Sequence, residues 1–262
     1  MYYFRKFFLT SLIGLSFLVS IGCAGVNIPT PSGMTGGLEA GDSAEKILAF
    51  FDSIPYREDG AINKDGDFTL FADQQARFET PGLNCSGFTV AASRYFFKRD
   101  YVLSDVMIDR LADSGADAEL GADWDFGYDV ILNLTEGMDR KAMLPFGDTV
   151  DISSSNAMSL RGFDLHDLKA WADVISKMKK GKVYLFSMSK PVSFKNYKVL
   201  HYHVGVIVPD GKGHVWLCHA THKGGVNKVD ISAIRNLKRV VDANPDSKLG
   251  KRMIFIVEAS LK

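Results

Sequence analysis

Residues 201–221 read HYHVGVIVPDGKGHVWLCHAT, and this stretch decides the fold. Two runs of β-branched and aromatic residues, 203–208 and 215–219, flank the turn-forming segment 209–213. Such runs around a Pro-Asp-Gly turn predict a β-hairpin. Further runs of the same kind lie at residues 183–187 and 253–258. The C-terminal part of the chain is therefore predicted to form an antiparallel sheet.

Alternation along the hairpin decides which side chains share a face. Successive strand residues point to opposite faces, so His203 is expected on the same face as Ile207. On the partner strand the same rule turns His219 and Cys218 to opposite faces. If His219 faces a reactive centre, Cys218 faces away from it, which weakens a disulfide between Cys85 and Cys218 without excluding it.

The N-terminal half of the chain predicts helices. Asp42 and Glu45 can cap a helix reciprocally, and the apolar residues of 47–51 give that helix a buried face. After a Pro-Gly break, the apolar residues of 86–96 favour a buried helix that starts at or near Cys85. A helix N-terminus favours an anion, so we expect a lowered pKa for the Cys85 thiol.

The segment 104–180 carries weaker signals. Its acidic residues between positions 105 and 129 lack the alternate spacing of a calcium loop, so we interpret them as solvated surface and predict no metal site. Residues 164–179 repeat apolar positions at helical spacing and predict an amphipathic packing helix. We expect 104–180 to be a largely helical insertion.

The first 22 residues have the features of a secretory signal. Arg5 and Lys6 precede an uncharged, mainly apolar run, 7–22, that is short for a membrane span. Residues 20–23, Ser-Ile-Gly-Cys, resemble the bacterial lipoprotein processing box, in which the cysteine receives the lipid. Cys23 is thus the expected lipidation site, and cleavage of an ordinary secretory signal nearby is the alternative.

Composition and charge argue against a nucleic-acid-binding protein and against a disulfide-dense scaffold. The chain has 31 basic and 31 acidic residues, so removal of Arg5 and Lys6 with the signal leaves a slightly acidic protein, which argues against nucleic acid as a partner. Three cysteines are too few for a disulfide-dense scaffold. The expected organisation is a signal peptide at 1–22, a flexible tether at 23–41 and one domain at 42–262.

Four motifs together resemble a known enzyme family. They are Ile-Pro-Tyr-Arg at 54–57, Asn-Cys-Ser-Gly-Phe at 84–88, His-Val-Gly-Val-Ile-Val at 203–208 and His-Ala at 219–220. This set is similar to the landmarks of the NlpC-type cell-wall cysteine peptidases, which are papain-like enzymes. The resemblance implies an α+β fold in which N-terminal helices, the nucleophile helix among them, pack on a small antiparallel sheet.

The resemblance also implies roles for single residues. Cys85 is the nucleophile, His203 the base and His219 the residue that orients the imidazole. Oxyanion or substrate-binding roles fall on Tyr56, Asn84 and Ser86. Asn84 stands where the family usually has an aspartate that helps to bind the free amine of an N-terminal alanine, and a neutral side chain binds ammonium less well.

The implied function is hydrolysis of an amide bond in peptidoglycan stem peptides through a thioester intermediate, by an exported, lipid-anchored enzyme that needs no cofactor. Cysteine before histidine fits this family rather than its permuted, lipid-acyltransferase relatives. Ala24 lacks the aspartate that retains many lipoproteins in the inner membrane, which favours the outer membrane. The expected partners are peptidoglycan or muropeptides and, through the lipid, the membrane.

Three other interpretations stay open. An N-acetylmuramoyl-L-alanine amidase would cut the bond between the glycan lactyl group and the peptide. A non-catalytic lipoprotein could bind wall fragments with a relic site. His201 and His203, if they share a strand face, could ligate zinc with His219 or His214, since three histidines and a water form a catalytic zinc site. The zinc hypothesis leaves the cysteine motif unexplained.

Overall fold

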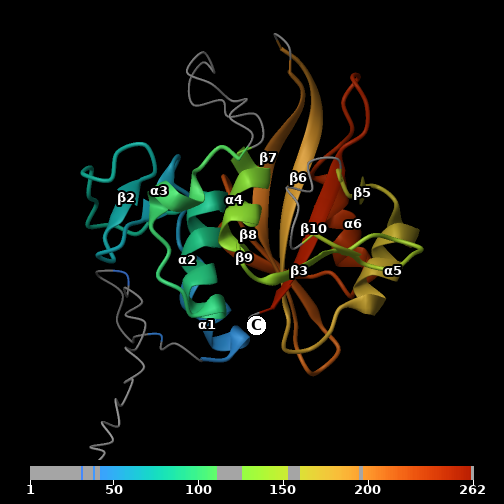
Figure 1. Cartoon of the computed structure of the whole chain (residues 1–262), viewed down its shortest axis with the longest axis horizontal. Coiled ribbons are helices and arrows are strands. Elements are labelled where there is room, and N and C mark those ends of the chain that lie inside the picture. Colours follow the sequence, from blue (N-terminus) through green and yellow to red (C-terminus); the bar gives the residue numbers. More distant parts are fainter. Residues whose placement is uncertain are drawn as a thin grey trace, which may run out of the picture.

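The computed structural model describes residues 31, 38, 42–110, 126–152, 160–194 and 197–260. It is an α+β fold in which one large antiparallel sheet carries helices on both faces (Figure 1). The predicted signal peptide, Cys23 and most of the predicted tether lie outside the described residues. Within those residues, no helix has the length and apolar character needed to cross a bilayer.

The large sheet has eight strands, and every neighbouring pair is antiparallel. Their order is β4-β3-β10-β6-β7-β8-β9, and β5 also pairs with β10. Their bounds are β3 (Asp139–Ala142), β4 (Val150–Asp151), β5 (Phe163–Asp164), β6 (Val183–Phe194), β7 (Tyr197–Pro209), β8 (Val215–Thr221), β9 (Gly225–Asp230) and β10 (Met253–Ser260). All four predicted strands and the predicted hairpin are confirmed.

Six helices and a two-stranded sheet complete the described fold. Their bounds are α1 (Ala44–Phe51), α2 (Cys85–Phe97), α3 (Leu103–Val106), α4 (Phe126–Leu134), α5 (Leu168–Lys177), α6 (Ile234–Asp242), β1 (Gly60–Ile62) and β2 (Phe68–Leu70). Residues of α1, α2 and α4 pack on one face of the large sheet, and residues of α5 and α6 pack on the other (Figure 1). Leu185 and Phe186, adjacent on β6, belong to the two different cores, as alternation requires.

The described residues of the segment 104–180 are less helical than predicted. They contribute α3, α4 and α5, but also β3, β4 and β5, which extend the sheet beyond the small one expected. The four residues of β3 read Asp-Arg-Lys-Ala and lack an apolar run. Arg140 is nevertheless buried, because its guanidinium donates to the carbonyl oxygens of Leu132 and Ile152 at 2.8 and 3.1 Å. The local sequence pattern does not reveal that an arginine will be buried with its hydrogen bonds formed to backbone carbonyl groups.

Polar side chains define where the predicted helices begin. Ser43, rather than Asp42, caps α1, and its Oγ accepts from the Lys46 N–H at 3.2 Å. Asn84 caps α2, as its Oδ1 accepts from the Gly87 N–H at 2.7 Å. The prediction that the buried helix begins at Cys85 is confirmed.

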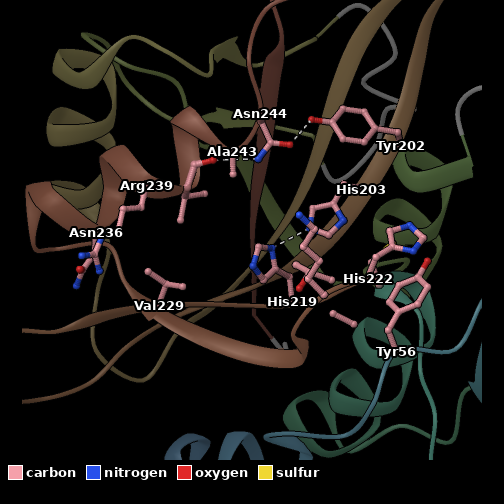
Figure 2. Close-up of a pocket in the computed structure, with 15 residues that line it drawn as sticks. Tyr56, Tyr202, His203, His219, His222, Val229, Asn236, Arg239, Ala243 and Asn244 are labelled. Atoms are coloured by element: carbon pink, nitrogen blue, oxygen red, sulfur yellow. Dashed lines mark hydrogen bonds between the residues drawn. The ribbon is translucent and has the colours of Figure 1, made fainter.

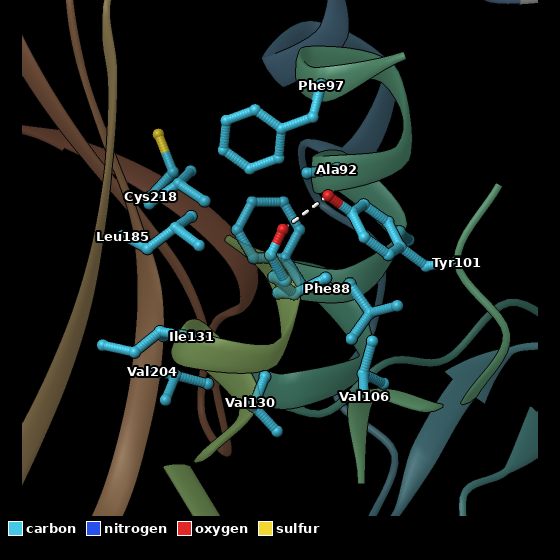
Figure 3. Packing of buried hydrophobic residues seen from close by; sticks show 14 of the residues in the cluster. Phe88, Ala92, Phe97, Tyr101, Val106, Val130, Ile131, Leu185, Val204 and Cys218 are labelled. Atoms are coloured by element: carbon cyan, nitrogen blue, oxygen red, sulfur yellow. Dashed lines mark hydrogen bonds between the residues drawn. The ribbon is translucent and has the colours of Figure 1, made fainter. Parts of the chain in front are cut away.

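Helix α2 is fixed firmly between the sheet and the other helices. Phe88 and Ala92 from α2 pack with Ile131 of α4 and with Leu185 and Val204 of the sheet (Figure 3). Burial of an aromatic side chain such as Phe88 contributes about 2 kcal/mol or more. Packing along almost the whole helix therefore holds its first residue, Cys85, at a constant position against β7.

Candidate active site

Cys85 lies where β7 and β8 separate. Pairing between these strands runs from Pro209 and Val215 only as far as Val206 and Cys218. Beyond that point, the backbone N–H of Val204 is free of β8 and donates to the Cys85 sulfur, to which Ser86 also donates. The nucleophile predicted from the sequence thus contacts the strand that carries the predicted base.

The surroundings of Cys85 raise the pKa of its thiol above the ordinary value, because burial disfavours the thiolate more than the hydrogen bonds from Val204 and Ser86 favour it. The lowered pKa expected from the helix N-terminus is therefore wrong. Depth of burial outweighs the macrodipole here, and the resting side chain is a neutral thiol.

His203 and His219, which the family resemblance assigns as base and orienting residue, form a hydrogen-bonded pair. The Nε2 atom of His203 lies 2.8 Å from the Nδ1 atom of His219, and Figure 2 shows the two rings facing each other. Cys218 packs in the core on the opposite face of the sheet. Cys85 and Cys218 are both free thiols in the structure.

Both histidines of the pair are neutral at ordinary pH. Burial lowers the pKa of His203 to about 3, with the neighbouring His219 adding to the effect, and it lowers the pKa of His219 to about 4. A neutral imidazole can accept a proton, so His203 is in the form that a general base requires.

Asn227 of β9 is a site residue that the sequence analysis missed. It lies opposite His219 in the β8–β9 register. Its amide nitrogen donates to Thr221 Oγ1 at 3.3 Å and to the Gly225 carbonyl at 3.0 Å, which leaves Oδ1 as the atom that accepts from His219. The register between β8 and β9 would have placed Asn227 beside His219, but β9 was not predicted from the sequence.

The Asn227 contact assigns the tautomers of the pair. The side-chain hydrogen bond of Asn227 raises the pKa of His219, which is the effect of an acceptor, and because Nδ1 of His219 contacts His203, we assign the N–H that Asn227 accepts to Nε2. The His219 Nδ1 atom then carries no proton and accepts from His203 Nε2–H. This arrangement leaves Nδ1 of His203 as the basic nitrogen.

A cavity of about 600 Å³ brings the site together. Cys85, His203 and His219 line it, and Tyr56 lies at one end (Figure 2). The full lining is Tyr56, Cys85, Tyr202, His203, His219, Ala220, Thr221, His222, Lys223, Val229, Asn236, Arg239, Val240, Ala243 and Asn244. Its volume suits a small peptide or a ligand of similar size.

Three residues predicted to bind the oxyanion or substrate have different surroundings. Asn84 uses its Oδ1 to cap α2, and Ser86 is buried beneath the nucleophile; neither lines the cavity. Tyr56 does line it, and its hydroxyl lies 3.4 Å from Glu58 Oε2, to which it can donate. Its ring packs against the His222 ring, with centroids 4.1 Å apart and the two planes tilted by 36°. The predicted oxyanion role of Tyr56 stays a prediction.

The zinc hypothesis fails because His201 and His203 lie on opposite faces. A register shift in the β6–β7 pairing falls between their partners, Met188 and Ser189. His201 is consequently buried against α4, with Nδ1 2.9 Å from Ser187 Oγ and Nε2 3.2 Å from an Arg161 nitrogen.

His214 lies near the β7–β8 turn and stacks on Trp216, away from the His203–His219 pair. Among the residues with a described position, no group of three or more His, Cys, Asp or Glu side chains could hold a metal ion. The acidic positions 111–125 lie outside the described residues.

Comparison of the chain with protein-family models, curated proteins and solved structures finds no match. The functional argument therefore depends on the geometry of the site itself.

Proposed function

We propose that this protein is a cysteine hydrolase with a papain-like, NlpC-type arrangement, which cleaves an amide bond in peptidoglycan stem peptides. One observation carries the proposal: Cys85 at the start of a buried helix shares a cavity with a hydrogen-bonded His203–His219 pair. A thiol, a neutral base and a residue that orients the base are the parts needed for nucleophilic acyl transfer. The sequence motifs around Cys85 and His203 support the cell-wall substrate by resemblance.

The first half of the reaction forms a thioester. His203 Nδ1 takes the thiol proton as the Cys85 sulfur attacks the amide carbonyl, because the raised thiol pKa and lowered imidazole pKa keep the resting pair neutral. The His219 Nδ1 lone pair stabilises the imidazolium that forms. His203 then donates the proton to the leaving nitrogen, and the C–N bond breaks to release an amine.

The second half consumes water. His203 removes a proton from a water molecule that attacks the thioester, and the collapse of the second tetrahedral intermediate releases a carboxylate and restores the thiol. Backbone N–H groups at the start of α2, with Tyr56, are proposed to stabilise both oxyanions. We further propose that the enzyme is exported and held at the envelope by a lipid on Cys23.

Digestion of defined muropeptides tests the proposal. We expect the mature domain to release fragments whose masses identify the cleaved amide, and Cys85→Ala to release none while unfolding at the same denaturant concentration. Cleavage between the lactyl group and alanine would identify an amidase instead. Unchanged muropeptides with the parent protein would contradict hydrolysis and favour a wall-binding lipoprotein.

A further inference from the structure

Charge on the cavity wall indicates which substrates the site accepts. Two lining residues are cationic, Lys223 in the β8–β9 turn and Arg239 on α6. The described lining contains no aspartate or glutamate. We infer that the site selects anionic peptides, in which a carboxylate remote from the cleaved amide contacts Arg239 at the α6 end of the cavity; this inference rests on the proposed hydrolase function.

Both cations are available to a ligand. Lys223 and Arg239 are exposed, and neither forms an ion pair or hydrogen bond through its side chain within the described part of the chain. Asn236, one turn before Arg239 on α6, is held by its donation to the Asp230 carbonyl at 3.1 Å. Figure 2 shows Arg239 and Asn236 at one end of the cavity and Tyr56 at the other.

The wall between these ends is largely apolar. Val229 of β9 and Val240 of α6 contribute aliphatic surface, and the Tyr202 ring is held by its hydroxyl, which donates to Asn244 Oδ1 at 2.9 Å. A peptide with an apolar stem and a carboxylate at one end matches this arrangement, because its stem can contact the apolar wall while its carboxylate reaches the cationic end. Apolar contact and charge then fix the orientation of the ligand together.

The described lining offers a free amine no carboxylate. Asn84 carries no charge, and its Oδ1 is committed to the Gly87 N–H. Glu58 is exposed, lies outside the lining and contacts Tyr56 and His222 at the opposite end from Arg239. The cavity therefore favours a carboxylate over an ammonium group at its α6 end.

Two matched peptides test the inference: both contain the amide that the enzyme cleaves, and they differ only in a free carboxylate or a carboxamide at the remote end. We expect kcat/KM to be about fivefold higher for the carboxylate, since an exposed charge contact contributes up to about 1 kcal/mol. The R239Q variant should lose this preference through a higher KM for the carboxylate peptide. Lys238, exposed on α6 but outside the lining, supplies the matched control K238Q, which should keep the preference.

Equal kcat/KM for the two peptides, or a preference that survives R239Q, would overturn charge selection and leave the hydrolase function standing. If neither peptide is cleaved, the proposed function fails, and calorimetric binding of both peptides to Cys85→Ala decides the charge question separately. Tighter binding of the carboxylate supports the inference, whereas equal binding or no binding of either peptide overturns it.

Discussion

Asn227 is linked to His203 through His219. With Asn227 Oδ1 accepting from His219 and His219 accepting from His203, the remaining lone pair is on His203 Nδ1. The amide itself is held by Thr221 and Gly225, so it cannot rotate without losing two hydrogen bonds. We therefore propose that Asn227 is a positioning residue, which keeps the proposed base His203 in the productive tautomer.

Replacement of Asn227 tests this chain of hydrogen bonds. We expect Asn227→Leu to lower kcat by roughly 10- to 100-fold, the range typical of partners that orient functional histidines. Asn227→Asp keeps an acceptor toward His219 and should retain most of the activity. Nitrogen-15 NMR of the imidazoles should show a loss of the Nε2–H tautomer of His203 in Asn227→Leu only. An unchanged tautomer and kcat in that variant would assign Asn227 a purely structural role.

The contact between helix α2 and strand β1 sets the height of the nucleophile over the sheet. Gly87, the third residue of α2, lies so close to β1 that a Cβ there would overlap the Gly60 carbonyl oxygen. The same carbonyl accepts from the Asn84 N–H at 3.0 Å. Glycine at position 87 therefore allows the helix start and Cys85 to approach β1.

An alanine at position 87 tests that element contact. We expect Gly87→Ala to lower the free energy of unfolding by about 1–3 kcal/mol, because backbone must move to admit the methyl group. Gly147→Ala is the control, since a Cβ there has only the Pro145 carbonyl oxygen at 4.0 Å. Urea unfolding of both variants measures the difference. Equal midpoints for the two variants would contradict the close approach.

The strands and helices that contain buried apolar runs could be predicted from the sequence. The strands and helices whose sequences are largely polar could not. The apolar runs of β6, β7, β8 and β10 and the apolar helix α2 are covered on both sides, so burial and local pattern agree. β9 reads Gly-Val-Asn-Lys-Val-Asp and α6 reads IRNLKRVVD, and both lack such a run. Pairing with β8 and packing of Leu237 and Val241 create these elements, which line the cavity.

In the candidate site, too, features set by the local sequence pattern could be predicted, and features set by tertiary packing could not. Alternation correctly separated His219 from Cys218, because successive residues of β8 point to opposite faces. The pairing of His203 with His219, beyond the point where β7–β8 pairing ends, was implied by the family resemblance alone. The register shift that turns His201 away has no signature in the sequence. The raised pKa of Cys85 depends on how deeply tertiary packing buries it, which a helix-start argument does not measure.

At the scale of the whole molecule, the two-sided sheet buries several titratable rings. Burial lowers the pKa of His201 and of His203 to about 3 and that of His219 to about 4. An unfolded chain protonates these histidines near pH 6.5, whereas the folded chain does not. Protons therefore bind the unfolded state preferentially as pH falls below 6.5, and folding stability decreases with them.

Denaturation at two pH values measures this linkage. Between pH 7 and pH 5 we expect a loss of up to about 2 kcal/mol for each buried histidine, seen as a lower urea midpoint. His201→Asn removes one of these groups and should reduce the pH dependence. Equal stability of the parent protein at both pH values would contradict neutral burial of the three rings.

Chemical labelling of new amino groups in purified sacculi measures the proposed Cys85-dependent hydrolysis of peptidoglycan amides. Each cleaved amide yields one amine, so we expect a steady rise in labelled amines with the parent protein and none with Cys85→Ala. The absence of a rise with the parent protein, or an equal rise with Cys85→Ala, would show that Cys85 does not drive this hydrolysis.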